Sequence, residues 1–357
     1  MNNYDLFKDS LNFTNNKVLV SFLGTERFFS SIYNVDIFDF ITNQDIMVES
    51  QYHTFKKFPE VLFIPGIWPN YGSGIILPSL FGVKINWYKN SSPIAPEPIL
   101  KNLKEDIYYL DNIDILKNGF GPWYFKTLEK FVSDRRFEDN VYFAWSSGPG
   151  ELAGVLMGLE NLLINMKTDY DNLITVLDKL TDIIINFLEK QFSLNKFAKG
   201  FLLTDDISGL ISNELYREVL MPFHLRIRKK FKEKFLIFHN DTKSDHILDS
   251  LIEAGIDVFN FGPTTNIDLL IEKMLKPKKV AIMGNLDPVG VLMSSDKNFI
   301  RGKTRELLNK AGLHPGFILS AGGGLNVGDP ESVKVIIEEV AKFNKKNKKI
   351  KSQQYGS

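Results

Sequence analysis

The second half of the chain repeats one pattern, in which a short apolar run ends at a cluster of polar or glycine residues. A helix-like segment follows most of these runs. Short buried strands that alternate with helices are typical of a parallel sheet, and repeated this often they predict a (β/α)8 TIM barrel with N-terminal additions. In such a barrel the active site lies at the C-terminal ends of the strands, which are the polar ends of these runs. The runs are 201–206, 235–241, 258–262, 280–287 and 317–324.

The first half of the chain carries the same pattern less regularly. Segments 17–22 and 61–64 are apolar enough to form strands, and segment 141–148 is an apolar run that ends in small polar residues. Apolar residues recur with a helical period over 151–166, which predicts a helix there. We expect an N-terminal extension packed on the barrel, the barrel itself and a flexible, lysine-rich tail. Their ranges are 1–60, 61–343 and 344–357.

Composition narrows the classes of function. The 357 residues are 44% hydrophobic, enough for a sizeable core. Lysine plus arginine and aspartate plus glutamate each number 43, so the zero net charge gives no overall attraction to nucleic acid or to an anionic membrane. The absence of cysteine excludes disulfides, iron–sulfur clusters, thiol nucleophiles and cysteine-ligated zinc within this chain. We identify neither a signal peptide nor a membrane-length apolar run, so we expect a cytoplasmic enzyme.

Polar residues at the predicted strand ends are the candidates for catalysis. His239 follows four apolar residues, and its position at a strand end favours a functional role, as a metal ligand or as an acid–base group, over simple packing. Asp205 and Asp206 are adjacent, and alternation along a strand directs their side chains to opposite sides, so at most one faces the barrel mouth. One of them contacts substrate or metal, or the alternative role, capping of the next helix or loop, applies. His239 and Asp241 together suit zinc or another divalent ion.

A second set of residues near strand ends is expected to contact the substrate. Asn285 can donate a hydrogen bond to a substrate oxygen, and turn formation is its alternative role. The glycine-rich run at 320–324 can offer backbone amides to an anion, or can form a tight turn. Aromatic side chains can line an apolar pocket, although packing is their more frequent role. The candidates for substrate binding are Asn285, Ser320, Gly323, Trp68, Tyr71 and Trp145.

Several of these motifs resemble, in order and spacing, those of the uroporphyrinogen decarboxylase superfamily. That group of (β/α)8 barrels includes the decarboxylase and the zinc-dependent methyltransferases of corrinoid and O-demethylase systems. Each motif is weak alone, and together they extend from about residue 141 to residue 343. Members share the barrel and differ in the site, so the resemblance does not by itself decide the reaction. The matching positions are 148–152, 157–158, 204–212, 221–222, His239, 254–257, 284–288, 320–324 and Pro330.

The chain departs from the decarboxylase in the features that bind a polyanionic substrate. The decarboxylase has an arginine-rich N-terminal segment that holds the many carboxylates of its substrate, a task that suits guanidinium groups. In this chain Arg27 is the only arginine before Arg135. The aspartate that lies under the pyrrole nitrogens in the decarboxylase would fall in segment 63–68, which has no acidic residue. A metal-independent decarboxylase of a porphyrinogen, or of a smaller carboxylated substrate, is therefore the alternative.

In the methyltransferase branch, a His-x-Cys pair and a distant cysteine bind a zinc ion that activates a thiol or a similar nucleophile. This chain keeps His239, but Asp241 stands at the first cysteine position and Gly323 at the second, and no third ligand can be identified. The resemblance favours a methyltransferase with an atypical, cysteine-free site. His239 and Asp241 would bind the metal, and Asp205 or Asp206 would contact a small-molecule substrate.

The resemblance also bears on the partners of the protein. In a methyl-transfer pathway the partner would be a separate corrinoid protein. A non-catalytic barrel that binds a tetrapyrrole or a corrinoid partner is a second alternative to the methyltransferase. Related barrels often form homodimers, although no interface can be identified in the sequence.

Overall fold

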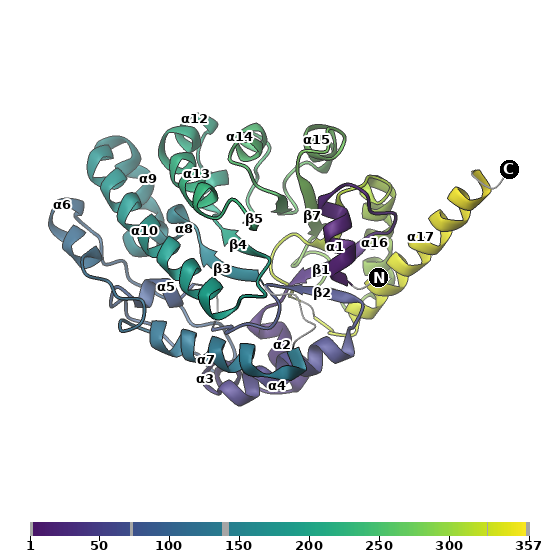
Figure 1. The fold of residues 1–357 in the computed structure, drawn as a ribbon, viewed down its shortest axis with the longest axis horizontal. Helices are drawn as coiled ribbons and strands as arrows, with labels where there is room; N and C mark the ends of the chain where they lie inside the picture. Colours follow the sequence, from purple (N-terminus) through teal and green to yellow (C-terminus); the bar gives the residue numbers. More distant parts are fainter. Residues whose placement is uncertain (1–2, 72–73, 138–142, 327, 355–357) are drawn as a thin grey trace.

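A computed structural model describes residues 3–71, 74–137, 143–326 and 328–354 of the chain. In these ranges, eight parallel strands stand at the centre of the molecule and helices surround them, which confirms the predicted (β/α)8 barrel (Figure 1). The strands pair in the order β2-β1-β8-β7-β6-β5-β4-β3. Between β2 and β3, a hydrogen bond from Phe143 N to Pro65 O, 2.8 Å long, joins the two ends of the sheet. The strands are β1 (Leu19–Leu23), β2 (Val61–Ile64), β3 (Phe143–Ser147), β4 (Gly200–Thr204), β5 (Phe235–Asn240), β6 (Val258–Phe261), β7 (Ala281–Leu286) and β8 (Phe317–Ala321).

Each of the five apolar runs of the second half forms a strand of this barrel. These strands are buried on both faces, which explains why their sequences are mostly apolar and do not alternate. In the parallel register, Thr204 lies beside His239, and His239 lies beside Asn260. The polar residues that end separate strands therefore meet at one end of the barrel.

The first barrel strand lies earlier in the chain than the sequence analysis placed it. β1 pairs in parallel with β2 (Val20 beside Val61) and with β8 (Leu19 beside Ile318). The range 1–60, expected to be an extension packed on the barrel, thus supplies a strand of the barrel itself. The reason is physical, since without β1 the edges of β2 and β8 would be left unpaired.

The helices differ from the predicted pattern at two points. The helical period over 151–166 is divided by Gly158, whose φ of 80° ends α8 and starts α9 in a new direction. The lysine-rich tail at 344–357, expected to be flexible, is helical through Gln354, and residues 355–357 lie outside the described part. The α-helices are α1 (Asn3–Leu11), α2 (Glu26–Tyr33), α3 (Ile37–Thr42), α4 (Gln44–Lys57), α5 (Ile76–Ser79), α6 (Leu103–Asp106), α7 (Gly121–Ser133), α8 (Pro149–Met157), α9 (Leu159–Thr168), α10 (Tyr170–Leu194), α11 (Ile207–Leu210), α12 (Asn213–Leu215), α13 (Met221–Lys230), α14 (Leu248–Glu253), α15 (Ile267–Leu270), α16 (Lys297–Ala311) and α17 (Ser332–Gln354). Turns of 3-10 helix are η1 (Ile107–Leu110) and η2 (Arg135–Phe137), and π-helical turns are η3 (Tyr216–Leu220) and η4 (Ile271–Leu275).

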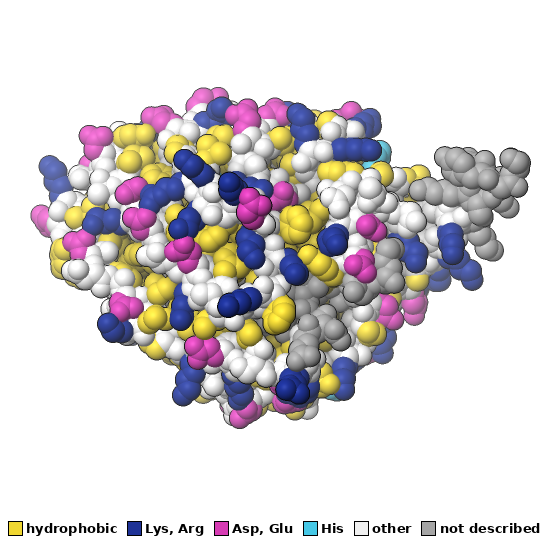
Figure 2. All heavy atoms as spheres, viewed as in Figure 1, with side chains coloured by type: hydrophobic (Ala, Val, Ile, Leu, Met, Phe, Trp, Pro, Cys, Tyr) yellow, Lys and Arg dark blue, Asp and Glu magenta, His cyan; other side chains and the backbone are white. Residues whose placement is uncertain are grey.

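The surface carries charges of both signs without a dominant patch on the face shown in Figure 2, where lysine and arginine are interspersed with aspartate and glutamate. This distribution agrees with the zero net charge of the chain. Among the described helices, none combines the length and the apolar character that crossing a bilayer requires.

Candidate active site

A pocket of about 240 Å³ opens where the C-terminal ends of the strands meet. Its wall comes from β1 to β5, from the loops after β1, β2, β4, β5 and β8, and from the first turns of α2 and α8. This is the position of the active site in (β/α)8 barrels. The lining residues are Leu23, Gly24, Thr25, Glu26, Ile64, Pro65, Trp68, Asn70, Trp145, Glu151, Leu202, Thr204, Asp206, His239, Asp241 and Gly324.

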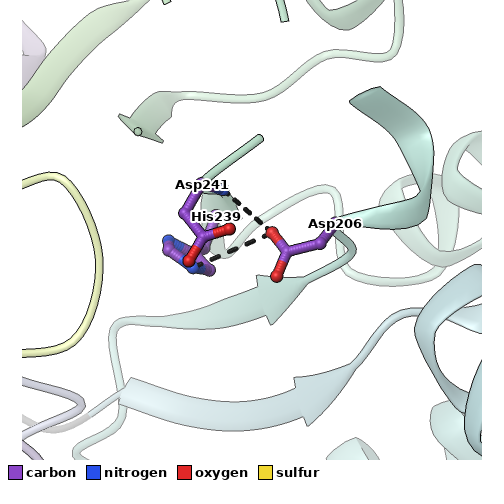
Figure 3. Close-up of side chains that lie close together, drawn as sticks. All are labelled: Asp206, His239 and Asp241. Carbon is purple, nitrogen blue, oxygen red and sulfur yellow. Dashed lines mark hydrogen bonds and ion pairs between the residues drawn. The ribbon is translucent and has the colours of Figure 1, made fainter. Parts of the chain in front are cut away.

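Three of these residues form a compact group of metal-ligating type. Asp206 follows β4, while His239 and Asp241 come from the end of β5 and the loop after it. One ligand atom from each side chain lies within 4.8 Å of the others (Figure 3). The Nε2 atom of His239 is 4.0 Å from Oδ1 of Asp206, and the backbone N–H of Asp241 donates to the same oxygen at 2.9 Å. Asp206 is thus a candidate for the third ligand that the sequence did not identify.

The orientation of the His239 ring is fixed by Asn260 of β6. The Nδ2 atom of Asn260 donates to the carbonyl oxygens of Met283 (2.7 Å) and Ala321 (3.3 Å), so its Oδ1 must face His239. Because Oδ1 can only accept, the Nδ1–H of His239 donates to it at 2.6 Å. In the neutral ring, Nε2 then carries a free lone pair, which faces the carboxylates of the pocket.

Asp205 lies on the other side of its strand end and does not line the pocket. It is buried, and its Oδ2 accepts hydrogen bonds from the backbone N–H of Gly150 (2.9 Å) and from Nε2 of His224 (3.0 Å). The expectation that at most one of the two adjacent aspartates faces the mouth therefore agrees with the geometry. The alternative role of capping the next helix does not apply to Asp205, because its side chain bonds the first turn of the preceding helix α8.

Glu151 is a further acidic residue of the pocket. It lies in the first turn of α8, and its Oε2 accepts a hydrogen bond from Oγ1 of Thr204 at 2.5 Å. Burial raises the pKa of Glu151 well above its usual range, and the nearby charge of Asp206 raises it further. Burial likewise raises the pKa of Asp206, although the positive charge that His239 can carry opposes this effect. The pocket therefore concentrates carboxyl groups whose ionised forms a bound cation would favour.

Two of the predicted substrate-binding residues line the pocket. Trp68 follows β2 and Trp145 lies in β3, and their ring centroids are 5.5 Å apart. The backbone of Trp68 is held by Gln51, which accepts from its N–H at 3.1 Å and donates to its carbonyl oxygen at 2.9 Å. The indole N–H of Trp68 is buried and has no hydrogen-bond partner among the described residues.

The other four predicted substrate-binding residues lie outside the pocket wall. Tyr71 is fully buried, and its hydroxyl pairs with Thr127 at 2.5 Å. The amide of Asn285 donates to the carbonyl oxygen of Gly262 at 3.3 Å, and Ser320 is fully buried in β8. At Gly323 a Cβ atom would lie 3.7 Å from Oδ2 of Asp241, so this position borders the triad without contributing a side chain.

Glu26, Glu151, Thr204 and Asn260 were missed as site residues by reasoning from the sequence. For Glu151 and Thr204 a signal was present, since both lie at the end of an apolar run in motifs that carry the family resemblance. Asn260 also gave a signal, because it is a polar residue inside the otherwise apolar strand at 258–261. Glu26 gave none, because the strand before it was not recognised as part of the barrel.

Comparison with known protein families shows to which family the chain belongs. The model of the family described as uroporphyrinogen decarboxylase (URO-D) matches residues 25–343. The chain belongs to the uroporphyrinogen decarboxylase family. The matched range begins just after β1, which agrees with a barrel that starts well before residue 61.

Proteins similar to this chain carry the names of different enzymes. The chain is 24% identical over 230 residues to a methylated-thiol–coenzyme M methyltransferase of Methanosarcina mazei, a match that covers 64% of this chain and 60% of that protein. It is 27% identical over 301 residues to a uroporphyrinogen decarboxylase of Wigglesworthia glossinidia brevipalpis, covering 77% and 78% of the two chains. The solved structure of a methyltransferase from Methanosarcina mazei superposes with a TM-score of 0.78 at 15% identity, over 96% of this chain and 99% of that one, which establishes the shared fold.

The triad has donor atoms that suit a divalent ion, but these donors differ from the thiolates described for the zinc-dependent branch of the superfamily. One imidazole nitrogen and two carboxylates are ordinary ligands of zinc and of harder divalent ions. The two carboxylates supply the same ligand charge as two thiolates would. The donor atoms differ, because oxygen is harder than sulfur and disfavours the softest ions.

Proposed function

We propose that this chain is a methyltransferase whose active site is the pocket at the barrel mouth, with a divalent ion held by Asp206, His239 and Asp241. The observation that carries the proposal is the triad itself. It joins ligand atoms from two strand ends within 4.8 Å, with a histidine whose Nε2 lone pair is directed by Asn260. The similarity to a methyltransferase of Methanosarcina mazei supports the type of reaction.

The roles of the residues follow from their chemistry. When bound, a divalent ion supplies a Lewis acid that polarises the nucleophile or the leaving group of the transfer. Asn260 holds the His239 ring in the orientation that presents Nε2. Trp68 and Trp145 give the pocket an apolar wall that excludes water from the transferred methyl group. In this proposal the methyl group passes to or from a corrinoid carried by a separate protein.

The charge of the pocket disfavours the alternative of a porphyrinogen decarboxylase. The described lining residues include Glu26, Glu151, Asp206 and Asp241 and contain neither lysine nor arginine. A substrate with many carboxylates would be repelled by this wall and would find no guanidinium partner. A volume of about 240 Å³ is also small for a tetrapyrrole, because pockets for drug-sized ligands are about 300–1,000 Å³.

Metal analysis and a transfer assay test the proposal together. Protein purified without chelator should contain an equimolar divalent metal, which His239→Ala and Asp206→Asn should lose. The control His53→Ala changes an exposed histidine away from the pocket and should keep the metal. The metal-loaded protein should demethylate methylcobalamin in the presence of a thiol, followed by absorbance. A metal-free protein that decarboxylates uroporphyrinogen would overturn the proposal.

A further inference from the structure

The barrel has a seam between β2 and β3, the two strands at the ends of the pairing order. Among the described residues, one backbone hydrogen bond crosses this seam, from Phe143 N to Pro65 O. A buried N–H or C=O that is left without a hydrogen bond destabilises the fold. Backbone groups along the seam therefore need partners other than a neighbouring strand.

Two buried glutamines bind the backbone of the two tryptophans at the seam. The N–H of Trp68 donates to Oε1 of Gln51 at 3.1 Å, and Nε2 of Gln51 donates to the carbonyl oxygen of Trp68 at 2.9 Å. Gln191 binds the N–H and the carbonyl oxygen of Trp145 in the same way, at 3.0 and 2.9 Å. A primary amide offers the donor and the acceptor that a peptide group offers. Each glutamine, one from α4 and one from α10, thus takes the place of a missing strand neighbour.

These contacts determine where one wall of the pocket lies. The indole rings of Trp68 and Trp145 are 5.5 Å apart between centroids, and both residues line the pocket. Because both are almost fully buried, they form a packed wall that limits the space beside the triad. Gln191 is held in turn by Tyr124, whose hydroxyl donates to its Oε1 at 2.9 Å. Neither Gln51 nor Gln191 is among the described residues that line the pocket or form the triad.

On the basis of the methyltransferase function proposed above, we infer that Gln51 and Gln191 are positioning residues that set the width of the pocket through Trp68 and Trp145. They thereby limit the size of the small molecule that the pocket admits. Without its amide partner, a tryptophan backbone is free to shift although no atom of the pocket wall has been removed. A shift of about 1 Å near a reacting group can change a rate about 100-fold, so such a movement is large enough to alter selectivity.

Circular dichroism reports on this wall without any need for activity. Two indoles in contact couple their electronic transitions and give an exciton couplet, a pair of bands of opposite sign. The other two tryptophans of the chain, Trp87 and Trp123, pack on Phe120. The couplet should therefore come from Trp68 and Trp145, and Trp145→Phe should abolish it.

Substitutions of the glutamines test their control of the indole pair. Gln51→Met and Gln191→Met nearly keep the side-chain length and remove the hydrogen bonds to the backbone, so each should lose most of the couplet. Gln44→Met is the matched control, because Gln44 lies on the same helix as Gln51 and donates to Thr127 instead. This control should keep the couplet. Folded Gln51→Met and Gln191→Met proteins with the wild-type couplet overturn the inference.

Gln51→Glu keeps the inference testable if the methionine variants do not fold. A neutral carboxyl group can donate and accept as the glutamine amide does, whereas its ionised form cannot donate to the carbonyl oxygen of Trp68. The couplet of this variant should match the wild type in mild acid and be lost as the new carboxyl group ionises. The wild type should keep its couplet over the same pH range. A variant couplet that does not depend on pH overturns the inference.

Two thiols of different bulk test the effect on selectivity. In the metal-loaded protein with methylcobalamin, Gln51→Met and Gln191→Met should raise the kcat/KM of phenylmethanethiol relative to that of ethanethiol by about tenfold over the wild-type ratio. Comparison with the wild-type ratio cancels the intrinsic reactivity of the thiols. Zinc affinity should not change, because the glutamines bind the tryptophan backbone and not the triad. Calorimetric titration of the zinc-loaded protein with the same thiols gives the ratio of affinities without turnover.

The two proposals can fail separately. A complete lack of methyl transfer, with the couplet and the ratio of thiol affinities changing as expected, would reject the methyltransferase function and leave the positioning role standing. Methyl transfer with a wild-type thiol ratio in both methionine variants would uphold the function and reject the inference.

Discussion

Replacing Asn260 by alanine tests whether a residue outside the pocket controls the metal site. Asn260 is fully buried, and its Oδ1 accepts from the Nδ1–H of His239 at 2.6 Å. Without it, the imidazole N–H loses its buried partner, and neither the tautomer nor the ring angle remains fixed. Loss of such an outer partner of a metal-ligating histidine typically lowers metal affinity about 10- to 100-fold, or about 1.4–2.7 kcal/mol.

The assay is competition for zinc against a fluorescent chelator at neutral pH, with folding monitored by circular dichroism. The matched control is Thr265→Val, which removes the hydrogen bonds of another buried polar side chain, to Ser244 and Thr242, without touching the triad. We expect Thr265→Val to bind zinc as tightly as the wild type. An Asn260→Ala protein that is folded and retains wild-type affinity would refute the reasoning.

Four further outcomes follow from the geometry. Asp241→Cys places a soft donor in the triad, so it should shift binding towards cadmium and away from manganese, measured by competition between the two ions. Asp205→Asn should lower the free energy of unfolding by about 3 kcal/mol in urea melts, because it replaces the buried carboxylate that accepts hydrogen bonds from Gly150 and His224, yet leave the metal content of the folded fraction unchanged. Burial raises the pKa of Glu151, so the folded protein favours the protonated form. In metal-free protein the stability that this group contributes is therefore present at low pH and is lost as pH rises above the usual carboxyl range. Glu151→Gln should make the melting temperature less dependent on pH in that range. Although burial alone would raise it, hydrogen bonds from cationic side chains of α16 and α17 lower the pKa of Glu339 to about 2. Its contribution, about 2 kcal/mol after allowance for the exposed partners, should therefore be lost as pH falls below the usual carboxyl range, and Glu339→Gln should remove it at neutral pH in urea melts.

The barrel could be predicted because burial on both faces leaves a direct trace in the sequence. Segments such as 201–203 and 235–238 are apolar at every position, and the first polar residues mark the end of the strand. The same pattern placed His239 and one of Asp205 and Asp206 at the mouth. It was weaker at β1, where the strand was noticed but its two neighbours, β2 and β8, are distant in sequence.

The parts of the site that could not be predicted depend on contacts between elements. Choosing Asp206 over Asp205 required knowing that His224 and the first turn of α8 lie behind the strand end. Tyr71 carried the right composition for a pocket, but its hydroxyl is occupied by Thr127 of α7. Whether a polar side chain faces the pocket or the protein interior depends on contacts with residues distant in sequence, which a local sequence pattern does not reveal.

The hydrogen bonds of the Asn260 side chain bear on how this site can evolve. Through three hydrogen bonds it links β6 to the histidine of β5 and to the main chains of β7 and β8. The orientation of the imidazole ring is thus set by contacts among the strands of the barrel, whereas Trp68, Asp206 and Asp241 lie on the loops that follow the strands. Those loops can exchange a ligand atom or reshape the substrate wall by single substitutions without turning the ring. In such a scaffold the strands keep the histidine in place, and the loops after the strands can evolve new metal and substrate preferences.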